Sequence, residues 1–184
     1  MAPKNKITRE EIIEAALLLV EKHGKDELNA RALARSLGIS TQPIFSNFDS
    51  MEELMHEVGK KATATYLGYI EETAASGLYP AYKASGMAYI RFAREKRELF
   101  KLTFMDSGGK YDAKAYYEII DAMANSIGIS KEDALEMHLR MWVFVHGIAT
   151  MAATEFLDFD DEYASKMITD IYNGLVYKYK AKGE

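Results

Sequence analysis

Apolar residues recur every three or four positions along nearly the whole chain, which is the spacing of helices that bury one face. Two capping boxes, at 8–11 and 50–53, mark helix starts, because each places a serine or threonine three residues before a glutamate. Glycine and proline punctuate the junctions, as at Gly24, Gly38 and Pro80. No segment alternates apolar and polar residues as a half-buried strand does.

We therefore predict an all-α protein of about nine helices. The expected helices lie at about 8–24, 29–37, from 40 onward, 50–76, 80–95, 99–105, 113–127, 131–156 and 161–180. Because the first three are short and the later ones longer, residues 1–50 are expected to form a head domain and residues 51–184 a body. No flexible linker separates the two, so a continuous helix can carry motion from the body to the head.

The segment 31–48 has the spacing of a helix-turn-helix. Ala34 is small and lets two helices approach closely, and Gly38, four residues later, suits a turn that needs a positive φ. The apolar residues that can hold the two helices together are Leu33, Leu37, Ile39 and Ile44. This pattern is typical of a corner whose second helix enters the major groove of DNA, although any compact pair of helices can share it.

The second helix of this corner carries the side chains expected to read bases. We predict that Ser40 caps it and that Pro43 lies in its first turn, where a missing N–H costs no intrahelical bond. Gln42 can pair with adenine through its amide, and Thr41 can offer a base its hydroxyl or its methyl group.

Charge is distributed unevenly between head and body. The chain carries a formal net charge of −5, but residues 1–48 hold seven basic and six acidic residues, whereas residues 49–184 hold sixteen and twenty-two. An acidic body can therefore carry a near-neutral head whose few cations face one way. Arg31 and Lys6 are the cations expected to contact phosphates, which position a protein on DNA without specifying sequence.

Over residues 8–60 the chain resembles the tetracycline-repressor (TetR) family. Members commonly read Leu-Gly-Val-Ser, three variable positions, Leu-Tyr-x-His-Phe and then Ser-Lys-x-x-Leu, and the matching stretches here are 37–40, 44–48 and 50–54. The resemblance implies a DNA-binding head on a body that dimerises and binds an effector. The residues expected on the DNA surface are Lys6, Arg31, Ser40, Thr41, Gln42, Pro43, Phe45, Ser46 and Asn47.

Three positions depart from the family pattern. Phe45 replaces a tyrosine and its hydroxyl, Asn47 replaces a histidine, and Met51 replaces a lysine. Loss of a cation weakens DNA binding and reduces its salt dependence. Either binding here is modest, or it depends more on the remaining cations of the head, namely Lys4, Lys6, Arg9 and Arg31.

A second match lies at 142–147, which is similar to the Trp-x-x-x-His-Gly stretch of one subgroup of the family. The resemblance implies an effector pocket in the body, and aromatic and methionine side chains suit the walls of an apolar site. The same residues at helical spacing equally fit a packed core. The candidates for effector contact are Tyr66, Met87, Phe104, Tyr117, Trp142 and His146.

Apolar stripes on the last two expected helices indicate self-association, which the family resemblance also implies. The candidate interface residues are Phe144, Ile148, Met151, Ile168, Ile171 and Leu175. A two-fold dimer would place its two recognition helices on half-sites about 34–36 Å apart.

The sequence contains no residue pattern typical of catalysis, a cofactor or a metal site. Cysteine is absent, the four histidines lack metal-ligand spacing, and 107–110 lacks the first glycine of a phosphate-binding loop. No apolar run fits a signal peptide or a membrane span, so we expect a cytoplasmic protein that is not an enzyme.

Two functions remain open at this point. One is a repressor that binds double-stranded operator DNA as a homodimer and is released by a small, mostly apolar effector. The other is an all-helical module that binds protein or packs the nucleoid without an effector.

Overall fold

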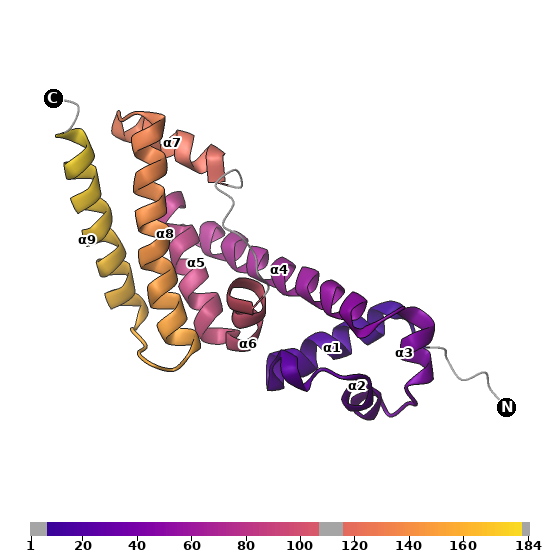
Figure 1. Ribbon diagram of the computed structural model, residues 1–184. Helices are drawn as coiled ribbons and strands as arrows, with labels where there is room; N and C mark the ends of the chain where they lie inside the picture. Colours follow the sequence, from indigo (N-terminus) through magenta and orange to yellow (C-terminus); the bar gives the residue numbers. More distant parts are fainter. Residues whose placement is uncertain (1–6, 107–115, 182–184) are drawn as a thin grey trace. The chain divides into compact units, whose positions relative to one another are not determined.

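The computed structural model describes residues 7–106 and 116–181, and within these ranges it is all-α, with no strand (Figure 1). The predicted fold class is therefore confirmed. The α-helices are α1 (Arg9–His23), α2 (Ala30–Leu37), α3 (Gln42–Asn47), α4 (Met51–Ala75), α5 (Ala81–Glu95), α6 (Arg97–Phe100), α7 (Tyr117–Ile127), α8 (Lys131–Ala153) and α9 (Asp161–Lys180). A 3₁₀ turn, η1 (Lys25–Glu27), follows α1, and a π-helical segment, η2 (Lys101–Asp106), continues α6.

The chain packs as two compact units. The head unit contains the described residues 7–65 and 96–106, and the body unit contains 66–95 and 116–181. Helix α4 contributes its first part to the head unit and its second part to the body unit. By packing, the head unit thus extends past residue 50, whereas the functional division expected at that residue stays a prediction.

In the head unit, local signals in the sequence set the limits of α1. The Thr8 hydroxyl accepts a hydrogen bond from the Glu11 N–H at 3.2 Å, and the Glu11 carboxylate accepts one from the Thr8 N–H at 2.8 Å. This reciprocal pair is the predicted capping box. Gly24 ends the helix with a φ of 83°, in the region that side chains disfavour.

The core of the head unit draws one apolar face from each of its helices. Its fully buried members are Ile12, Ala16, Val20, Leu33, Ile44, Leu54, Val58, Ala62, Leu99 and Phe100. Helix α1 contacts α2, α3 and α6, so it is the centre of this packing.

Helix α6 and η2 join the head unit through α1, although the sequence reading had assigned this segment to the body. Ion pairs accompany the apolar contact: Lys96 bonds Glu21, and the Lys25 Nζ lies 3.3 Å from a carboxylate oxygen of Asp106. These contacts join residues about 75 to 80 positions apart in the chain, so periodicity alone could not reveal them.

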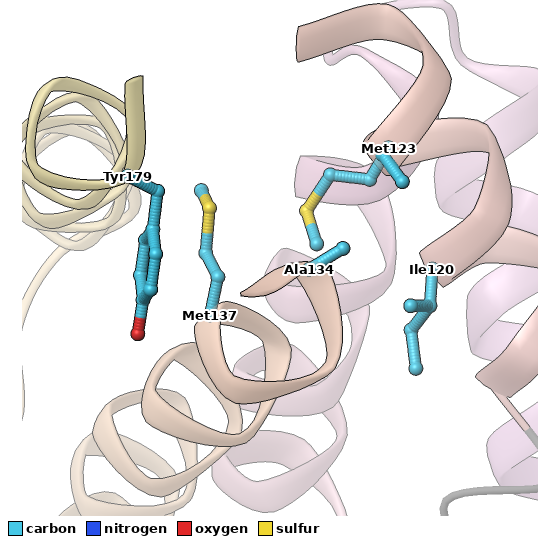
Figure 2. Packing of buried hydrophobic residues seen from close by; sticks show 6 residues of the cluster. Ile120, Met123, Ala134, Met137 and Tyr179 are labelled. Carbon is cyan, nitrogen blue, oxygen red and sulfur yellow. The ribbon is translucent and has the colours of Figure 1, made fainter. Parts of the chain in front are cut away.

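The body unit is built around α8, which packs against α5, α7 and α9. One buried cluster ties α7, α8 and α9 together (Figure 2). In it Met137 of α8 lies beside Tyr179 of α9, while Met123 of α7 points toward Ala134. Because α8 buries residues toward three neighbours, burial within the chain already covers much of its apolar surface.

The end of α8 was predicted three residues too late, at 156 instead of Ala153. Glu155 adopts a φ of 57°, which breaks the helix even though the local sequence permits it to continue. A tertiary contact holds this loop: the Arg94 guanidinium donates to Asp158 at 2.9 Å, to Asp161 at 2.6 Å and to the Phe159 carbonyl.

Two glycines of the head unit offer a matched test of this description. Gly38 has a φ of 66°, so Gly38→Ala is expected to destabilise the protein by about 1 kcal/mol through backbone strain. Gly59 lies inside α4, and a Cβ there meets no atom within 4 Å, so Gly59→Ala is expected to stabilise by about 0.5–1 kcal/mol. Urea unfolding followed by circular dichroism measures the free energy of unfolding of both variants. A change of the same sign in both would contradict the left-handed turn at Gly38 or the helical position of Gly59.

Candidate functional site

The turn between α2 and α3 is fixed by a glycine cap. Gly38 adopts the left-handed conformation, with φ 66° and ψ 30°. Its N–H donates to the Arg35 carbonyl at 3.2 Å, and the Ile39 N–H donates to the Ala34 carbonyl at 3.0 Å. This pair of bonds closes the helix and turns the chain sharply into α3. The positive φ expected at this position is confirmed.

Helix α3 begins one residue later than predicted, and Ser40 does not cap it. Thr41 is the cap residue, with φ −73° and ψ −16°, and no side chain bonds the first helical N–H groups. The reason lies in Pro43, the second helical residue, which has no N–H for a capping oxygen to accept from. Backbone alone closes the turn, through bonds from Ile44 and Phe45 to the Thr41 carbonyl at 3.1 and 3.3 Å.

The predicted DNA-contact residues belong to α2, to α3 and to the turn between them, except Lys6, which is outside the described residues. Exposed side chains belong to Arg31, Ser40, Gln42, Phe45 and Ser46, and half-buried ones to Thr41, Pro43 and Asn47. The Ser46 hydroxyl donates to the Gln42 carbonyl at 2.9 Å, and the Asn47 amide donates to the Pro43 carbonyl at 2.8 Å. Of these polar groups, the Gln42 amide is therefore the best placed to read a base.

Arg9 has a structural role that the sequence reading missed. Its guanidinium donates to the Asn47 carbonyl at 2.6 Å and to the Glu53 carboxylate at 2.8 Å, and it lies 4.1 Å from the centre of the Phe48 ring. Hydrogen bonds from the Asp49 N–H and then from Arg9 lower the pKa of Glu53, which favours its ionised form. Arg9 thus joins the end of α3 to the start of α4.

The surface around the corner has a local positive charge. Residues 28–48 contain two arginines and no acidic residue. Arg31 and Arg35, one helical turn apart, are both exposed. Arg35 was not among the predicted contacts, although its spacing from Arg31 was visible in the sequence. An acid-free segment with two exposed guanidinium groups can attract the phosphates of DNA.

The body unit encloses a cavity of about 410 Å³. Its walls come from the second part of α4 and from α5, α7, α8 and α9. The apolar and aromatic lining residues are Tyr66, Leu67, Ile70, Ile119, Met141, Trp142, Val145 and Ile168. The polar groups of the lining are the side chains of Tyr82, Ser85, Tyr89, Tyr116, Glu118 and His138. A large apolar cavity with a few polar groups is the usual form of a small-molecule site.

Two tyrosine–histidine hydrogen bonds connect α5 and α8 at this cavity. The Tyr82 hydroxyl lies 3.0 Å from Nδ1 of His138, and the Tyr89 hydroxyl lies 2.8 Å from Nδ1 of His146. The His146 ring also stacks on Trp142, with 4.9 Å between ring centres and 6° between planes. His146 therefore contacts two lining residues, Tyr89 and Trp142, although it is not itself part of the lining.

Burial favours the neutral forms of the imidazoles and phenols at the cavity. It lowers the pKa of His138 and His146 and raises the pKa of Tyr66, Tyr89 and Tyr116. At neutral pH the imidazoles are therefore uncharged and the phenols protonated. Each pair can present either a donor or an acceptor to a guest, depending on which partner holds the shared hydrogen.

Of the six residues predicted to contact an effector, Tyr66 and Trp142 line this cavity. Met87 lines a second cavity of about 330 Å³, together with Glu72, Thr73 and Arg91. Tyr117 is exposed and absent from both linings, although its neighbours Tyr116 and Glu118 face the larger cavity. Phe104 belongs to the head unit, where it packs on Phe100.

The lining residues Tyr82, Tyr89 and His138 were not predicted. The sequence does show that these residues share helix faces. Tyr82 and Tyr89 lie two helical turns apart, and His138 and His146 flank Trp142 at four-residue spacing. Only the packing of α5 on α8 pairs them.

The residues predicted to form a dimer interface differ in exposure. Ile171 is 40% exposed, and Phe144, Met151 and Leu175 are half-buried. Ile148 and Ile168 are each 3% exposed, so they already belong to the core of one chain. Further large apolar side chains are exposed on the same two helices at Leu139, Val143, Tyr163 and Tyr177.

Within residues 7–106 and 116–181, no three or more acidic or histidine side chains gather as they would around a metal ion. None of the helices in this part of the chain has the length and apolar character needed to cross a bilayer.

Comparison with known proteins covers both parts of the chain. Residues 12–58 match the family model for bacterial regulatory proteins of the tetR family, and residues 82–171 match that for the tetracyclin repressor-like C-terminal domain. An uncharacterised HTH-type transcriptional regulator of Mycobacterium tuberculosis is 26% identical over 160 residues, which cover 83% of this chain and 73% of that protein.

Two solved structures share the fold. A protein of unknown function from Rhodococcus sp. RHA1 has a TM-score of 0.76 at 23% identity, covering 96% of this chain and 100% of its own. A transcriptional regulator, described as putative, from Pseudomonas aeruginosa PAO1 has a TM-score of 0.70 at 15% identity, covering 96% of this chain and 95% of its own.

The buried imidazole of His138 leads to a pH-dependence prediction. Because burial lowers the pKa of His138 below its usual 6.5, the unfolded chain binds more protons than the folded protein below that value. The free energy of unfolding is therefore expected to fall as the pH drops through 6.5 toward the folded pKa, and to be constant above that window.

Urea unfolding at a series of pH values tests this with His138→Gln, which should show a shallower decline than the unmodified protein. His23→Gln, at an exposed position, is the control and should leave the decline unchanged. Equal declines in all three proteins would contradict the role assigned to the buried imidazole.

Proposed function

Because the chain belongs to the tetR family of DNA-binding transcriptional regulators, we propose that it is a repressor that binds operator DNA as a homodimer. A small, mostly apolar molecule in the body cavity would release it from the DNA. The observation that carries this proposal is that one chain combines a helix-turn-helix, formed by a segment without acidic residues, with an apolar cavity of about 410 Å³.

The DNA contacts follow from the exposure of the head residues. Gln42, at the start of α3, would read a base through its amide, and Thr41 would support it with its hydroxyl or methyl group. Arg31 and Arg35 would contact phosphates. The exposed ring of Phe45 offers apolar contact, for example to a thymine methyl group, where a tyrosine hydroxyl would otherwise reach a phosphate.

The proposed homodimer uses the outer faces of α8 and α9. Leu139 and Val143 lie one turn apart on α8, and Gly147 follows at the same spacing. A Cβ added at Gly147 or at Gly174 of α9 would meet nothing within 4 Å of its own chain. Glycine inside a helix costs about 1 kcal/mol, and close approach of a partner helix gives a reason to retain it.

Helix α4 provides the proposed link between cavity and head. Tyr66 and Ile70 line the cavity, while Leu54 and Val58, on the same unbroken helix, are fully buried in the head core. An effector that favours one position of the second part of α4 would thereby bias the head. A coupling of about 1–3 kcal/mol is typical of such regulation and corresponds to about a 5- to 150-fold change in DNA affinity.

The first test compares two head substitutions on the DNA upstream of the gene. Gln42→Ala is expected to reduce discrimination at one base pair by about 1–3 kcal/mol, because it removes a contact to a base edge. Arg31→Ala is expected to weaken binding to all sequences alike and to lower the salt slope by about two, one for each subunit of the dimer. Selection from randomised DNA and salt titrations measure these effects.

Two results would contradict this proposal. One is the absence of any preferred upstream sequence. The other is an equal loss on every sequence from both substitutions, which would favour non-specific packing of DNA.

The second test concerns the dimer. Ile171→Arg places a charge on the 40% exposed apolar face of α9, and burying it unpaired costs about 3 kcal/mol or more. The dimer dissociation constant is therefore expected to rise about a hundredfold or more. Light scattering after size exclusion measures it. Leu78→Arg, on a 75% exposed residue between α4 and α5, is the matched control and should leave the dimer intact.

A further inference from the structure

We infer that the body cavity is built for an uncharged, elongated ring compound that carries one hydrogen-bonding group at each end. The inference rests on the proposed function, since it names the class of effector that the same cavity would take. It follows from three properties of the lining: the spacing of the polar groups, the flat aromatic surfaces between them, and the near absence of charge.

The polar groups lie at two separated positions along α5. Tyr82 and Tyr89 both line the cavity, and each is bonded to a histidine of α8. Seven residues on a helix correspond to two turns and a rise of about 10 Å, with both side chains on one face. A guest that satisfies both hydroxyls must therefore carry polar groups about 10 Å apart along its length.

Between these two positions the lining is apolar and aromatic. Gly86, between the two tyrosines on α5, carries no side chain, and a Cβ there would lie 3.5 Å from Val145 and 3.6 Å from Ile168, so glycine lets α5 pack closely on α8 and α9 at this point. The Trp142 indole also lines the cavity, and its stacking on His146 fixes its plane. Tyr66 adds a second aromatic wall, packed edge-on against Tyr89 with ring centres 5.7 Å apart. Flat aromatic walls suit aromatic rings in stacked and edge contacts.

The charge of the lining argues against an ionised guest. Among the described lining residues the only charged side chain is Glu118, and it is exposed. An anion would find no cation among these residues and would lose its hydration without compensation. A cation would meet aromatic faces, which return part of its hydration energy, but the Glu118 carboxylate is exposed to solvent and offers only a weak ion pair. The paired hydroxyls and imidazoles are neutral, and each pair can donate to or accept from an alcohol, a ketone or an amide.

The probe chosen to test this is 4,4′-dihydroxybiphenyl, whose hydroxyls lie at opposite ends of two linked rings. Its comparators keep the rings and change the ends: biphenyl-4,4′-dicarboxylate is an anion, and 4-(trimethylammonio)biphenyl is a cation. Calorimetry measures affinity. Trp142 is the only tryptophan of the chain and lines the cavity, so its fluorescence reports where the probe binds.

The diol is expected to bind at least tenfold more tightly than either charged comparator and to change the Trp142 fluorescence. Tyr82→Phe and Tyr89→Phe each remove one hydroxyl and are expected to weaken the diol about three- to tenfold, as loss of one neutral hydrogen bond does. Tyr79→Phe, which lies outside the lining of this cavity and outside α8 and α9, is the matched control and should leave affinity unchanged. Circular dichroism verifies that each variant is folded.

Several results would overturn the inference. These are no binding of the diol, binding without a fluorescence change, equal or tighter binding of a charged comparator, and no effect of either tyrosine substitution in folded protein. Release of upstream DNA is measured separately. If the diol occupies the cavity but does not release DNA, the inference is supported and the proposed release is contradicted. If only a charged compound releases DNA, the inference is overturned and the proposed release is still supported.

Discussion

The structure depends on one constraint: α4 is a single hydrogen-bonded helix of 25 residues that belongs to both compact units. Its first part supplies Leu54 and Val58 to the head core, and its second part supplies Tyr66 and Ile70 to the cavity wall. A continuous helix transmits displacement along its axis, because bending it requires its backbone bonds to lengthen. The proposed regulation needs this connection and no flexible linker.

Polar side chains fix the geometry at both candidate sites. In the head, Arg9 ties the end of α3 to the start of α4, so its charge is matched internally and does not remain available for a phosphate. In the body, His138 and His146 hold two tyrosine hydroxyls of the opposite helix. Arg9 and His146 are residue types that often bind ligands, but here they bond to neighbouring residues of the same chain. Gln42 is exposed on the head, and Trp142 lines the cavity.

Local rules anticipated the elements and family membership. The Thr8–Glu11 capping box, the positive φ of Gly38 and the all-α class are confirmed, since each depends on neighbours within a few residues. One error was local, because Pro43 lies in the first turn of α3, where the cap expected from Ser40 is absent. The end of α8 was missed because a distant residue decides it: Arg94 of α5 holds the loop that follows α8.

The sequence by itself determined the helices, the helix-turn-helix and the family, because periodicity, caps and turn residues are written in short stretches of chain. Only the tertiary structure decided that α6 packs on α1, that Ile148 and Ile168 are core residues, and that tyrosines of α5 meet histidines of α8 around a cavity. Such contacts depend on how helices pack side by side, and a one-dimensional pattern shows which face is apolar but not which neighbour covers it.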